Sequence, residues 1–342
     1  MLSATECNLK EFYSKKNILV TGGTGSIGEK VVESILQYRP NRVIVFNRDD
    51  SKQYLMKRKF ANADNLHFCL GDIRDYQQVV AITRNVDIVF HTAALKQVPV
   101  CEENPFETIN INVLGSKNLI NACKFNHVSK VVNISTDKAV HPSNIMGMTK
   151  WFSEKLFKKA NAMTHNEGTR FSSVRFGNVI GSRGSVIPVW LKQLQSGQPL
   201  TITDTRMTRF LMTPSQAVHL VLKAAYYSLG GETYILKMNS ISVNGLLKAM
   251  NTYCKRRNMV LPPIRTIGKR PGEKMYEELL YEEERYHLVE DTELYAVLPT
   301  HFSLPYLHFQ PANITRYRSD YVDYISHEDL VSLIDHVQSC VE

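Results

Sequence analysis

Long hydrophobic runs are absent from this 342-residue sequence. No apolar stretch approaches the roughly 18 residues that a membrane-spanning helix needs, and residues 1–16 carry charges without the apolar segment of a secretion signal. Glycine and proline, with 17 and 13 residues, are too sparse for a collagen-like or low-complexity chain. We therefore expect a globular, cytoplasmic protein that has no membrane partner.

Cysteine is also scarce, with six residues and no pair at C-x-x-C spacing. This scatter argues against a disulfide framework and a zinc site, so we expect no bound metal. A net charge of +8 is compatible with a nucleic acid, an acidic membrane, a polyanionic small ligand or a basic surface without function. The basic clusters 52–59 and 255–257 lack the motifs of nucleic-acid-binding proteins, so nucleic acid is not an expected partner.

The length of the chain predicts about two domains. From residue 17 to about 190, β-branched runs alternate with helical periodicity, which is typical of a doubly wound parallel sheet with helices on both faces. The expected strands of this part are residues 17–21, 42–47, 66–70, 87–92, 130–136 and 171–176.

The pattern becomes less regular after residue 190. There we predict a smaller lobe that packs on the first domain, with the chain crossing between the two. We find no repeat at a fixed period and no flexible linker. The pattern predicts helices over residues 214–228, 243–256, 274–280 and 328–338, and strands over residues 200–203 and 233–238.

A glycine-rich loop follows the first expected strand and opens the first expected helix. Gly22, Gly25 and Gly28 have the spacing G-x-x-G-x-x-G. Glycine permits a tight turn and a close approach of backbone amides to a pyrophosphate at the helix N-terminus. The loop predicts an NAD(P)-binding Rossmann fold for residues 1–190, with residues 191–342 as the substrate-binding lobe and tail. A purely structural turn is the alternative.

The end of the second expected strand distinguishes NAD from NADP. A neutral residue followed by arginine, here Asn47 and Arg48, suits the 2′-phosphate of NADP, whereas an acidic residue would bind the ribose hydroxyl of NAD. Asp49 and Asp50 leave the NAD alternative open, but we predict NADP. Asp72, after the third strand, is a candidate acceptor for the adenine amine.

Candidate catalytic residues follow the fifth expected strand, at the edge where open α/β sheets bind ligands. Thr136 is the last residue of this strand, and Asp137 and Lys138 follow it directly. Met146 and Lys150 lie at i and i+4 of the next helix. A tyrosine in place of Met146 would complete the Tyr-x-x-x-Lys pair of a short-chain dehydrogenase. Because a thioether exchanges no proton, another base must act or the protein is not an enzyme.

Short motifs carry a resemblance to a known family over residues 16–290. In chain order they are GGTGSIG, NRDDSKQ, GDIRD, AALKQVP, STDKAV, MGMTK, RFGNV and RPGEK. The chain resembles the extended short-chain dehydrogenase/reductases that act on nucleotide sugars. Within them it is most similar to the soluble UDP-N-acetylglucosamine 4,6-dehydratases of polysaccharide biosynthesis, in the branch that also inverts C5 and has Met-x-x-x-Lys.

The resemblance implies a redox-neutral cycle on a UDP-sugar with NADP. Hydride leaves sugar C4, water is lost across C5 and C6, and hydride returns to C6. Asp137 is expected to protonate the departing 6-hydroxyl, and Lys138 to take the C5 proton if burial beside Lys150 lowers its pKa. The base for the 4-hydroxyl stays open between Asp137 and a water held by Thr136. Lys150 would bind the nicotinamide ribose.

The resemblance also implies a homo-oligomer, either a dimer or a hexamer. It further implies a group of residues that hold the nucleotide of the substrate, here called the nucleotide clamp. Arginines would contact the diphosphate, and Glu273 the uridine ribose. Lys96 would contact the sugar or a catalytic partner, unless it is an exposed loop lysine. The expected substrate-binding residues are Lys96, Asn178, Val186, Arg209, Arg270 and Glu273. The expected cofactor-binding residues are Gly22, Thr24, Gly25, Ser26, Ile27, Gly28, Arg48, Asp72, Ile73, Ala93, Ala94 and Lys150.

Three other functions stay open at the level of sequence. A non-catalytic NADP-binding sensor would explain the absent tyrosine, but it would not need Asp137, Lys138 and Lys150 together. A retaining 4,6-dehydratase or a UDP-HexNAc 4-epimerase would use the same residues, because the sequence does not show which face of the sugar meets Lys138.

Overall fold

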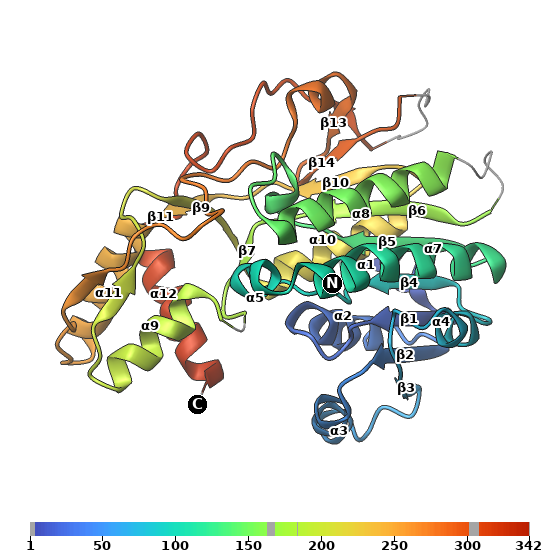
Figure 1. Cartoon of the computed structure of the whole chain (residues 1–342), viewed down its shortest axis with the longest axis horizontal. Helices are drawn as coiled ribbons and strands as arrows, with labels where there is room; N and C mark the ends of the chain where they lie inside the picture. The colour runs from blue at the N-terminus through green and yellow to red at the C-terminus, as the bar shows by residue number, and fades with distance from the viewer. Residues whose placement is uncertain (1–3, 163–167, 183, 301–307, 342) are drawn as a thin grey trace.

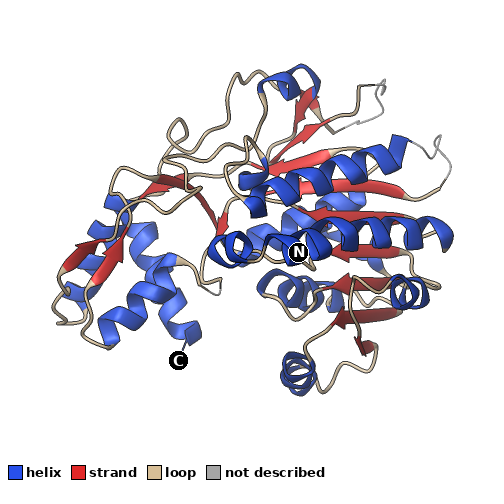
Figure 2. Cartoon of the chain, viewed as in Figure 1, coloured by secondary structure: helices blue, strands red, loops and turns tan. Residues whose placement is uncertain are grey.

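A mainly parallel β-sheet runs through the centre of the molecule (Figure 1, Figure 2). The computed structural model of the chain describes residues 4–162, 168–182, 184–300 and 308–341. Within these residues the strands, from one edge of the sheet to the other, are β15 (Gln310–Pro311), β13 (Leu288–Glu290), β14 (Leu294–Val297), β10 (Thr233–Leu236), β6 (Arg170–Arg175), β5 (Lys130–Ile134), β4 (Ile88–His91), β1 (Asn17–Thr21), β2 (Arg42–Asn47) and β3 (Leu66–Leu70). Neighbours from β10 to β3 are parallel, and the other three strands add antiparallel pairs. The predicted doubly wound parallel sheet is confirmed.

Successive apolar residues place β1 at the centre of this sheet. Ile18, Leu19 and Val20 are all fully buried. Ile18 pairs in register with Val43 of β2 on one side and with Ile88 of β4 on the other. A parallel strand that is covered on both faces needs such an uninterrupted apolar run. The central position of β1 brings the loop that follows it to the middle of the carboxyl edge of the sheet.

Helices cover both faces of the sheet. One layer contains α1 (Ala4–Tyr13), α2 (Ser26–Leu36) and α10 (Pro214–Tyr227), and the other contains α4 (Tyr76–Ile82), α7 (Gly115–Phe125) and α8 (Ile145–Ala162). A buried apolar cluster fills the space between the sheet and each layer. Shorter segments lie around the sheet, namely α3 (Asp50–Lys59), α5 (Val98–Glu103), α6 (Pro105–Ile109), the π-helical η1 (Asn110–Leu114) and the 3₁₀ turns η2 (Asp137–Ala139) and η3 (Glu282–His287).

A smaller lobe stands beside the sheet, on the left in Figure 1. Its elements are α9 (Val186–Gln195), α11 (Val243–Arg256), α12 (His327–Val341), the sheet of β7 (Asn178–Val179), β9 (Thr208–Met212) and β11 (Ser240–Ser242), and the pair of β8 (Leu200–Ile202) and β12 (Ile264–Thr266). A third buried cluster, with Trp190 and Tyr253, joins α9, α11 and α12. The chain leaves this lobe and returns to the main sheet at β10. The domain boundary near residue 190 stays a prediction.

The helix predicted over residues 274–280 is wrong. Gly272 has a φ of +71°, and the chain after it runs extended beside residues 317–319. Leu279 N donates to Tyr317 O at 3.1 Å, and Ser319 N donates to Glu277 O at 2.9 Å. Glu277 and Leu279 are buried while the residue between them is more exposed, which is the alternation of a strand. The apolar run here is too short to separate the two periods.

The other predicted elements are confirmed with small shifts at their ends. The strands over residues 17–21, 42–47 and 66–70 coincide with β1, β2 and β3, and the helix over 243–256 coincides with α11. The strand predicted over 130–136 ends at residue 134, because the chain turns there into η2. Among the described residues, no helix combines the length and the apolar composition that crossing a lipid bilayer requires.

Candidate active site

A cleft of about 1100 Å³ lies between the carboxyl ends of the parallel strands and the smaller lobe. Loops after the strands β1 to β6 form one wall, and α9, β8 and β11 contribute to the other. Every residue that the sequence predicts for the site lines this cleft, with Asp137 as the one exception. In the described part of the chain, no three His, Cys, Asp or Glu side chains are grouped as a metal site would require.

The glycine loop leaves the N-terminus of α2 open toward the cleft. A Cβ atom on Gly22, whose φ is +67°, would lie 2.7 Å from Cα of Ala93, and one on Gly28 would lie 2.6 Å from Gly22 O. A Cβ atom on Gly25 would meet only Gly22 O, at 3.2 Å. Gly25 is the residue before α2, and its lack of a side chain exposes the first amides of the helix. This cradle fits a pyrophosphate.

The end of β2 brings two cations, Arg48 and Lys52, to the cleft wall. Asp49 begins α3 as its cap, since its Oδ1 accepts a hydrogen bond from Lys52 N at 2.9 Å and its other carboxylate oxygen pairs with Lys52 Nζ. Asp50 is not on the wall of the cleft. Of the two carboxylates that left NAD as an alternative, Asp49 therefore lines the cleft but is engaged in a helix cap, and Asp50 does not line it.

Asp72 lines the cleft beyond β3, but its carboxylate is held by a neighbour. Arg74 Nη2 donates to Oδ2 at 2.6 Å and Arg74 Nε donates to Oδ1 at 3.0 Å. These hydrogen bonds keep the pKa of Asp72 below its ordinary value. Arg48 Nη1 lies 3.4 Å from Glu107 and 3.8 Å from Asp72, so Arg48 extends this network of charges.

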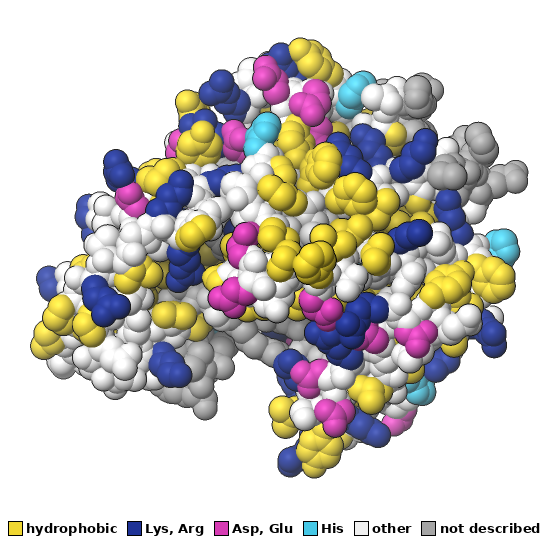
Figure 3. All heavy atoms as spheres, in the orientation of Figure 1, with side chains coloured by type: hydrophobic (Ala, Val, Ile, Leu, Met, Phe, Trp, Pro, Cys, Tyr) yellow, Lys and Arg dark blue, Asp and Glu magenta, His cyan; other side chains and the backbone are white. Residues whose placement is uncertain are grey.

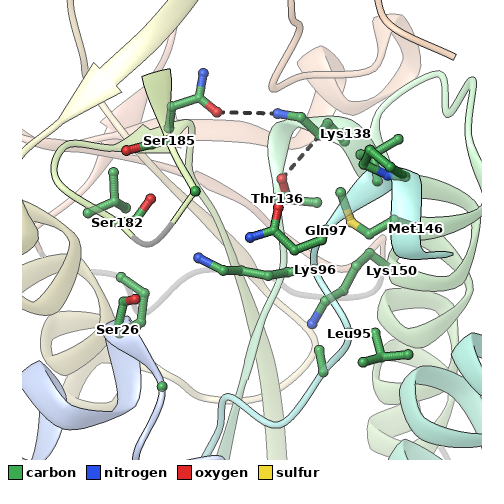
Figure 4. Close-up of a pocket in the computed structure, with 18 of the residues that line it drawn as sticks. Ser26, Leu95, Lys96, Gln97, Thr136, Lys138, Met146, Lys150, Ser182 and Ser185 are labelled. Atoms are coloured by element: carbon green, nitrogen blue, oxygen red, sulfur yellow. Dashed lines mark hydrogen bonds between the residues drawn. The ribbon is translucent and has the colours of Figure 1, made fainter. Parts of the chain in front are cut away.

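Met146 and Lys150 lie on the buried side of α8, as their spacing predicts (Figure 4). Lys150 Nζ donates to Ile134 O, at the end of β5, at 2.8 Å. Burial lowers the pKa of Lys150 to about 8, although the charge of Glu154 acts in the opposite direction. Lys150 is thus a cation with an unusually low pKa, held at the floor of the cleft.

The turn after β5 joins Thr136, Asp137 and Lys138 in one hydrogen-bonded unit. Thr136 Oγ1 donates to Asp137 Oδ1 at 2.8 Å. Lys138 Nζ donates to the same carboxylate oxygen at 2.9 Å and to Asn178 Oδ1 at 3.4 Å. Asp137 is fully buried, whereas Thr136 and Lys138 line the cleft. A ligand would therefore reach Asp137 only through these two neighbours.

The lowered pKa that the sequence analysis set as the condition for Lys138 to take the C5 proton is not found. Burial does favour the uncharged amine, but the charges of Asp137 and Glu277 outweigh it and raise the pKa of Lys138 above its ordinary value. The cation that acts on Lys138 is Arg209 and not Lys150. The ammonium form is the resting state of this side chain.

The predicted nucleotide clamp comes together on the lobe side of the cleft. Arg209 Nη2 lies 3.4 Å from Glu273 Oε1, and Arg270 N donates to Glu273 Oε2 at 3.1 Å. Arg209 Nη1 also donates to Thr208 O at 2.8 Å, which fixes the guanidinium against β9. Val186 opens α9 on the same side. Lys96 extends into the cleft from the loop after β4 (Figure 4).

Glu277 is the principal site residue that the sequence reasoning missed. It lines the cleft, is 2% exposed, and lies 3.7 Å from Lys138 Nζ and 3.8 Å from Arg209 Nε. Met275 and Leu279 lie two residues before and two residues after Glu277, and this strand-like spacing is the sequence signal that could have found it, because it places Glu277 on the same face as the two apolar residues. Lys52 and Lys274 are also on the wall and were not predicted as site residues.

Comparisons with known proteins identify the family of the chain. A family model described as "Polysaccharide biosynthesis protein" matches residues 18–299. UDP-N-acetylglucosamine 4,6-dehydratase (inverting) of Campylobacter jejuni subsp. jejuni serotype O:2 is 41% identical over 290 residues, which is 84% of each chain. UDP-glucose 4-epimerase of Rickettsia bellii is 42% identical over 279 residues, 80% of each chain. The X-ray structure of Pen from Bacillus thuringiensis is 40% identical with a TM-score of 0.90, and the match covers 96% of this chain and 99% of that one.

Proposed function

The chain belongs to the polysaccharide biosynthesis protein family, and we propose that it is a 4,6-dehydratase that acts on UDP-N-acetylglucosamine with NADP and inverts C5. The observation that carries this proposal is the unit of Thr136, Asp137 and Lys138, which lies at the same cleft as Lys150 and the glycine loop. The relative of that name from Campylobacter jejuni, at 41% identity, supports the same reaction.

The cofactor site would bind a nicotinamide dinucleotide through the glycine loop and Lys150. When bound, this group would accept hydride from sugar C4 and return it to C6. Arg48 and Lys52 would bind the 2′-phosphate of NADP, since Asn47 beside them is neutral and Asp49 is engaged in its helix cap.

Thr136 and Asp137 would handle the proton of the 4-hydroxyl together. Thr136 Oγ1 lies between the cleft and the buried carboxylate, to which it donates at 2.8 Å. The sugar proton would pass to the Thr136 oxygen while the proton of Thr136 moves to Asp137. The same route in reverse would deliver that proton to the departing 6-hydroxyl, so Asp137 would serve both steps without touching the sugar.

Lys138 would take the C5 proton once its ammonium has lost a proton. Hydroxide would then leave from C6 and receive the proton held by Asp137, which forms water. For inversion, a proton must return to C5 from the opposite face, with Lys96 or a bound water as the donor. Met146 would only shape the wall beside the sugar.

The UDP part of the substrate would lie along the lobe side of the cleft. Arg209 and Arg270 would contact the diphosphate, and Glu273 the uridine ribose, with Asn178 and Val186 beside them. The pairing of Arg209 and Glu273 at 3.4 Å supports a common ligand for both.

An exposed apolar face supports a homo-oligomer. It spans α5, α6, η1 and α8, which pack against one another, and Figure 3 shows apolar side chains gathered across the middle of this view. Its residues are Val100, Phe106, Ile109, Leu114, Met148 and Phe152, each more than a third exposed. Because monomers rarely expose large contiguous apolar patches, we propose that two copies pack through this face.

The test of the proposed function is incubation of the NADP-loaded protein with UDP-N-acetylglucosamine, followed by NMR of the sugar. A 4-keto-6-deoxy sugar is the expected product. Formation of UDP-N-acetylgalactosamine would instead identify a 4-epimerase, the activity that the name of the Rickettsia bellii relative favours. Binding of NADP without any change in the sugar would identify a sensor. The Lys138→Ala variant is the matched control, expected to bind NADP but to form the 4-keto-6-deoxy sugar at least about a hundredfold more slowly.

A further inference from the structure

Glu277 has a buried carboxylate. Hydrogen bonds hold the backbone of this residue in place, but its side chain is not held in the same way. Its N–H donates to Ser319 Oγ at 3.0 Å, and its carbonyl accepts from Ser319 N at 2.9 Å. By contrast, Oε2 has no hydrogen-bond partner among the described residues. Leaving a buried acceptor unpaired is energetically unfavourable, and more so for a charged group. Such a group in a cleft calls for an explanation in function.

Charged groups from three segments surround this carboxylate. Lys138 of η2 and Arg209 of β9 lie 3.7 and 3.8 Å from Oε1, and Lys274 of its own segment lies 4.0 Å from Oε2. Asp137, the other carboxylate of the cluster, opposes these three cations. Burial raises the pKa of Glu277, while Lys138 and Arg209 act in the opposite direction. Glu277 is thus close to three cations but bonded to none.

Lys138 needs a proton acceptor before it can work as a base. It rests as an ammonium because Asp137 and Glu277 raise its pKa, whereas only the free amine can take a proton from C5. The gap of 3.7 Å to Glu277 is about 0.8 Å longer than a hydrogen bond of about 2.9 Å. Catalytic hydrogen bonds commonly tighten when a ligand closes the site.

We propose that Glu277 is the positioning residue that accepts the proton of Lys138, so that the amine can then take the C5 proton. This inference rests on the proposed 4,6-dehydratase function. An N–H bond of Lys138 breaks and an O–H bond of Glu277 forms, which turns an ammonium and a carboxylate into an amine and a carboxylic acid. After turnover Glu277 releases its proton to water, and the donor on the opposite face of the sugar takes one up, so the protons balance.

Asp137 fits this task less well than Glu277. Its Oδ1 already accepts hydrogen bonds from Thr136 and Lys138, and hydrogen bonds to a carboxylate favour its charged form. The carboxylate of Glu277 accepts no hydrogen bond from the described residues. It lines the cleft, where it can exchange its proton with water. The two carboxylates therefore divide the work, with Asp137 for the sugar oxygens and Glu277 for Lys138.

The test is a single turnover of UDP-N-acetylglucosamine by NADP-loaded Glu277→Gln, with bound NADPH followed by its fluorescence. Oxidation of C4 does not use Lys138, so NADPH should form at the wild-type rate. Its decay requires loss of the C5 proton, and near neutral pH it should be at least about tenfold slower, a conservative figure for the loss of a positioned acid or base. The decay should speed up with rising pH, because hydroxide then removes the proton from Lys138. In the wild type the decay should stay flat.

Two further variants separate proton transfer from structure. Glu277→Asp keeps the charge but withdraws it by one methylene, so its decay should be intermediate, with a flatter pH dependence than that of Glu277→Gln. Glu278→Gln removes the neighbouring carboxylate, which faces His141 at 3.7 Å outside the cleft, and should behave as wild type. NADP binding by each variant reports that it is folded.

The outcomes are distinct. If the wild type forms no NADPH, the proposed function fails. If the wild type turns over but Glu277→Gln forms no NADPH, Glu277 acts on the hydride step and the inference is overturned. A decay in Glu277→Gln that is unchanged or faster also overturns it, because removal of a negative charge alone would lower the pKa of Lys138 and favour the amine.

Discussion

Two buried clusters in this molecule each place one cation between two carboxylates, and they differ in how completely the charges are paired. Arg175 donates to Glu154 at 2.7 Å and to Glu284 at 2.6 Å, and its third nitrogen also donates to Glu154. Lys138 bonds to one carboxylate at 2.9 Å and stands 3.7 Å from the other. Among the described residues, one oxygen of Asp137 and one of Glu277 have no partner.

We interpret the saturated cluster as structural and the partly paired cluster as the reactive one of the proposed mechanism. A fully satisfied buried network is rigid and holds its parts in one arrangement. The Arg175 cluster joins β6, α8 and η3, and it is closed to the cleft. The Lys138 cluster opens into the cleft. Incomplete pairing at a site that faces a ligand is therefore informative about function.

Tyr281 connects the two clusters. Its ring lies 5.3 Å from the Arg175 guanidinium, and its hydroxyl donates to Ala139 O at 2.6 Å. Ala139 is the last residue of the η2 turn, which begins with Asp137 and Lys138. The saturated cluster thus anchors the turn that carries the reactive one.

The largest expected effect is on stability, from Arg175→Met. The change leaves the buried carboxylates of Glu154 and Glu284 without their cation, and removal of one partner of such a network costs about 3–5 kcal/mol. Urea denaturation measures this loss in the free energy of unfolding. Lys138→Ala is the control, with a smaller loss, because Lys138 is less completely paired. A loss of less than about 1 kcal/mol in the free energy of unfolding of Arg175→Met would contradict the structural role of this cluster.

Lys150 is a third buried cation, and it bonds to a carbonyl oxygen. Burial lowers its pKa to about 8 in the folded protein, against about 10.4 in the unfolded chain. The folded state then binds fewer protons between these two pH values, so the cost of burial is full below pH 8 and disappears as pH rises toward 10.4. Lys150→Met should raise the free energy of unfolding at pH 7 by about 3 kcal/mol. This gain should shrink between pH 8 and 10.4, and a gain independent of pH would contradict the burial of a charge.

Loss of the reactive cluster should affect turnover and not cofactor binding. We expect Asp137→Asn and Lys138→Ala each to lower turnover at least about a hundredfold, the lower range for a positioned acid or base. NADP titration should be unchanged in both. Met146→Ala should cost far less, because the thioether only packs. Near-normal turnover of Lys138→Ala would remove it as the C5 base.

The smallest expected effect is on the affinity for NADP, and it comes from Arg48, which pairs with Glu107 at the cofactor end of the cleft. Arg48 is half exposed beside Glu107, so its ion pairs add little stability. Arg48→Ala should weaken NADP binding by about 1.5–3 kcal/mol, the range for a hydrogen bond to a charged group, with little change in unfolding. Wild-type protein should bind NADP more tightly than NAD. Equal titrations with the two dinucleotides would refute the assignment of Arg48.

Local patterns made the fold and half of the site predictable. The apolar run of β1 and the glycine loop after it depend on residues that are neighbours in the chain, and so does the i, i+4 spacing of Met146 and Lys150. The pKa of Lys138 depends on its burial, on Asp137 beside it, and on Glu277 and Arg209, which the fold brings in from distant segments. No sequence spacing encodes the burial or the distant contacts, so the sequence could not show in which direction this pKa moves.

The burial of Asp137 was unpredictable for the same reason. Its N–H donates to Phe176 O, just after β6, and the residue is fully buried. The sequence identified the residue from its place at the end of β5, but the direction of its side chain depends on the packing behind the sheet edge. Tertiary contacts therefore decide which members of a motif face the ligand.

In the mechanism that we propose, Lys138 takes the C5 proton from one face of the sugar and a proton returns from the other. The most direct measurement is NMR of the first product formed from UDP-N-acetylglucosamine in heavy water. We predict a 4-keto-6-deoxy sugar of L-configuration, with deuterium at C5 and the substrate's own C4 hydrogen at C6. A first product of D-configuration, seen before any slow nonenzymatic epimerisation, would contradict inversion and identify a retaining dehydratase.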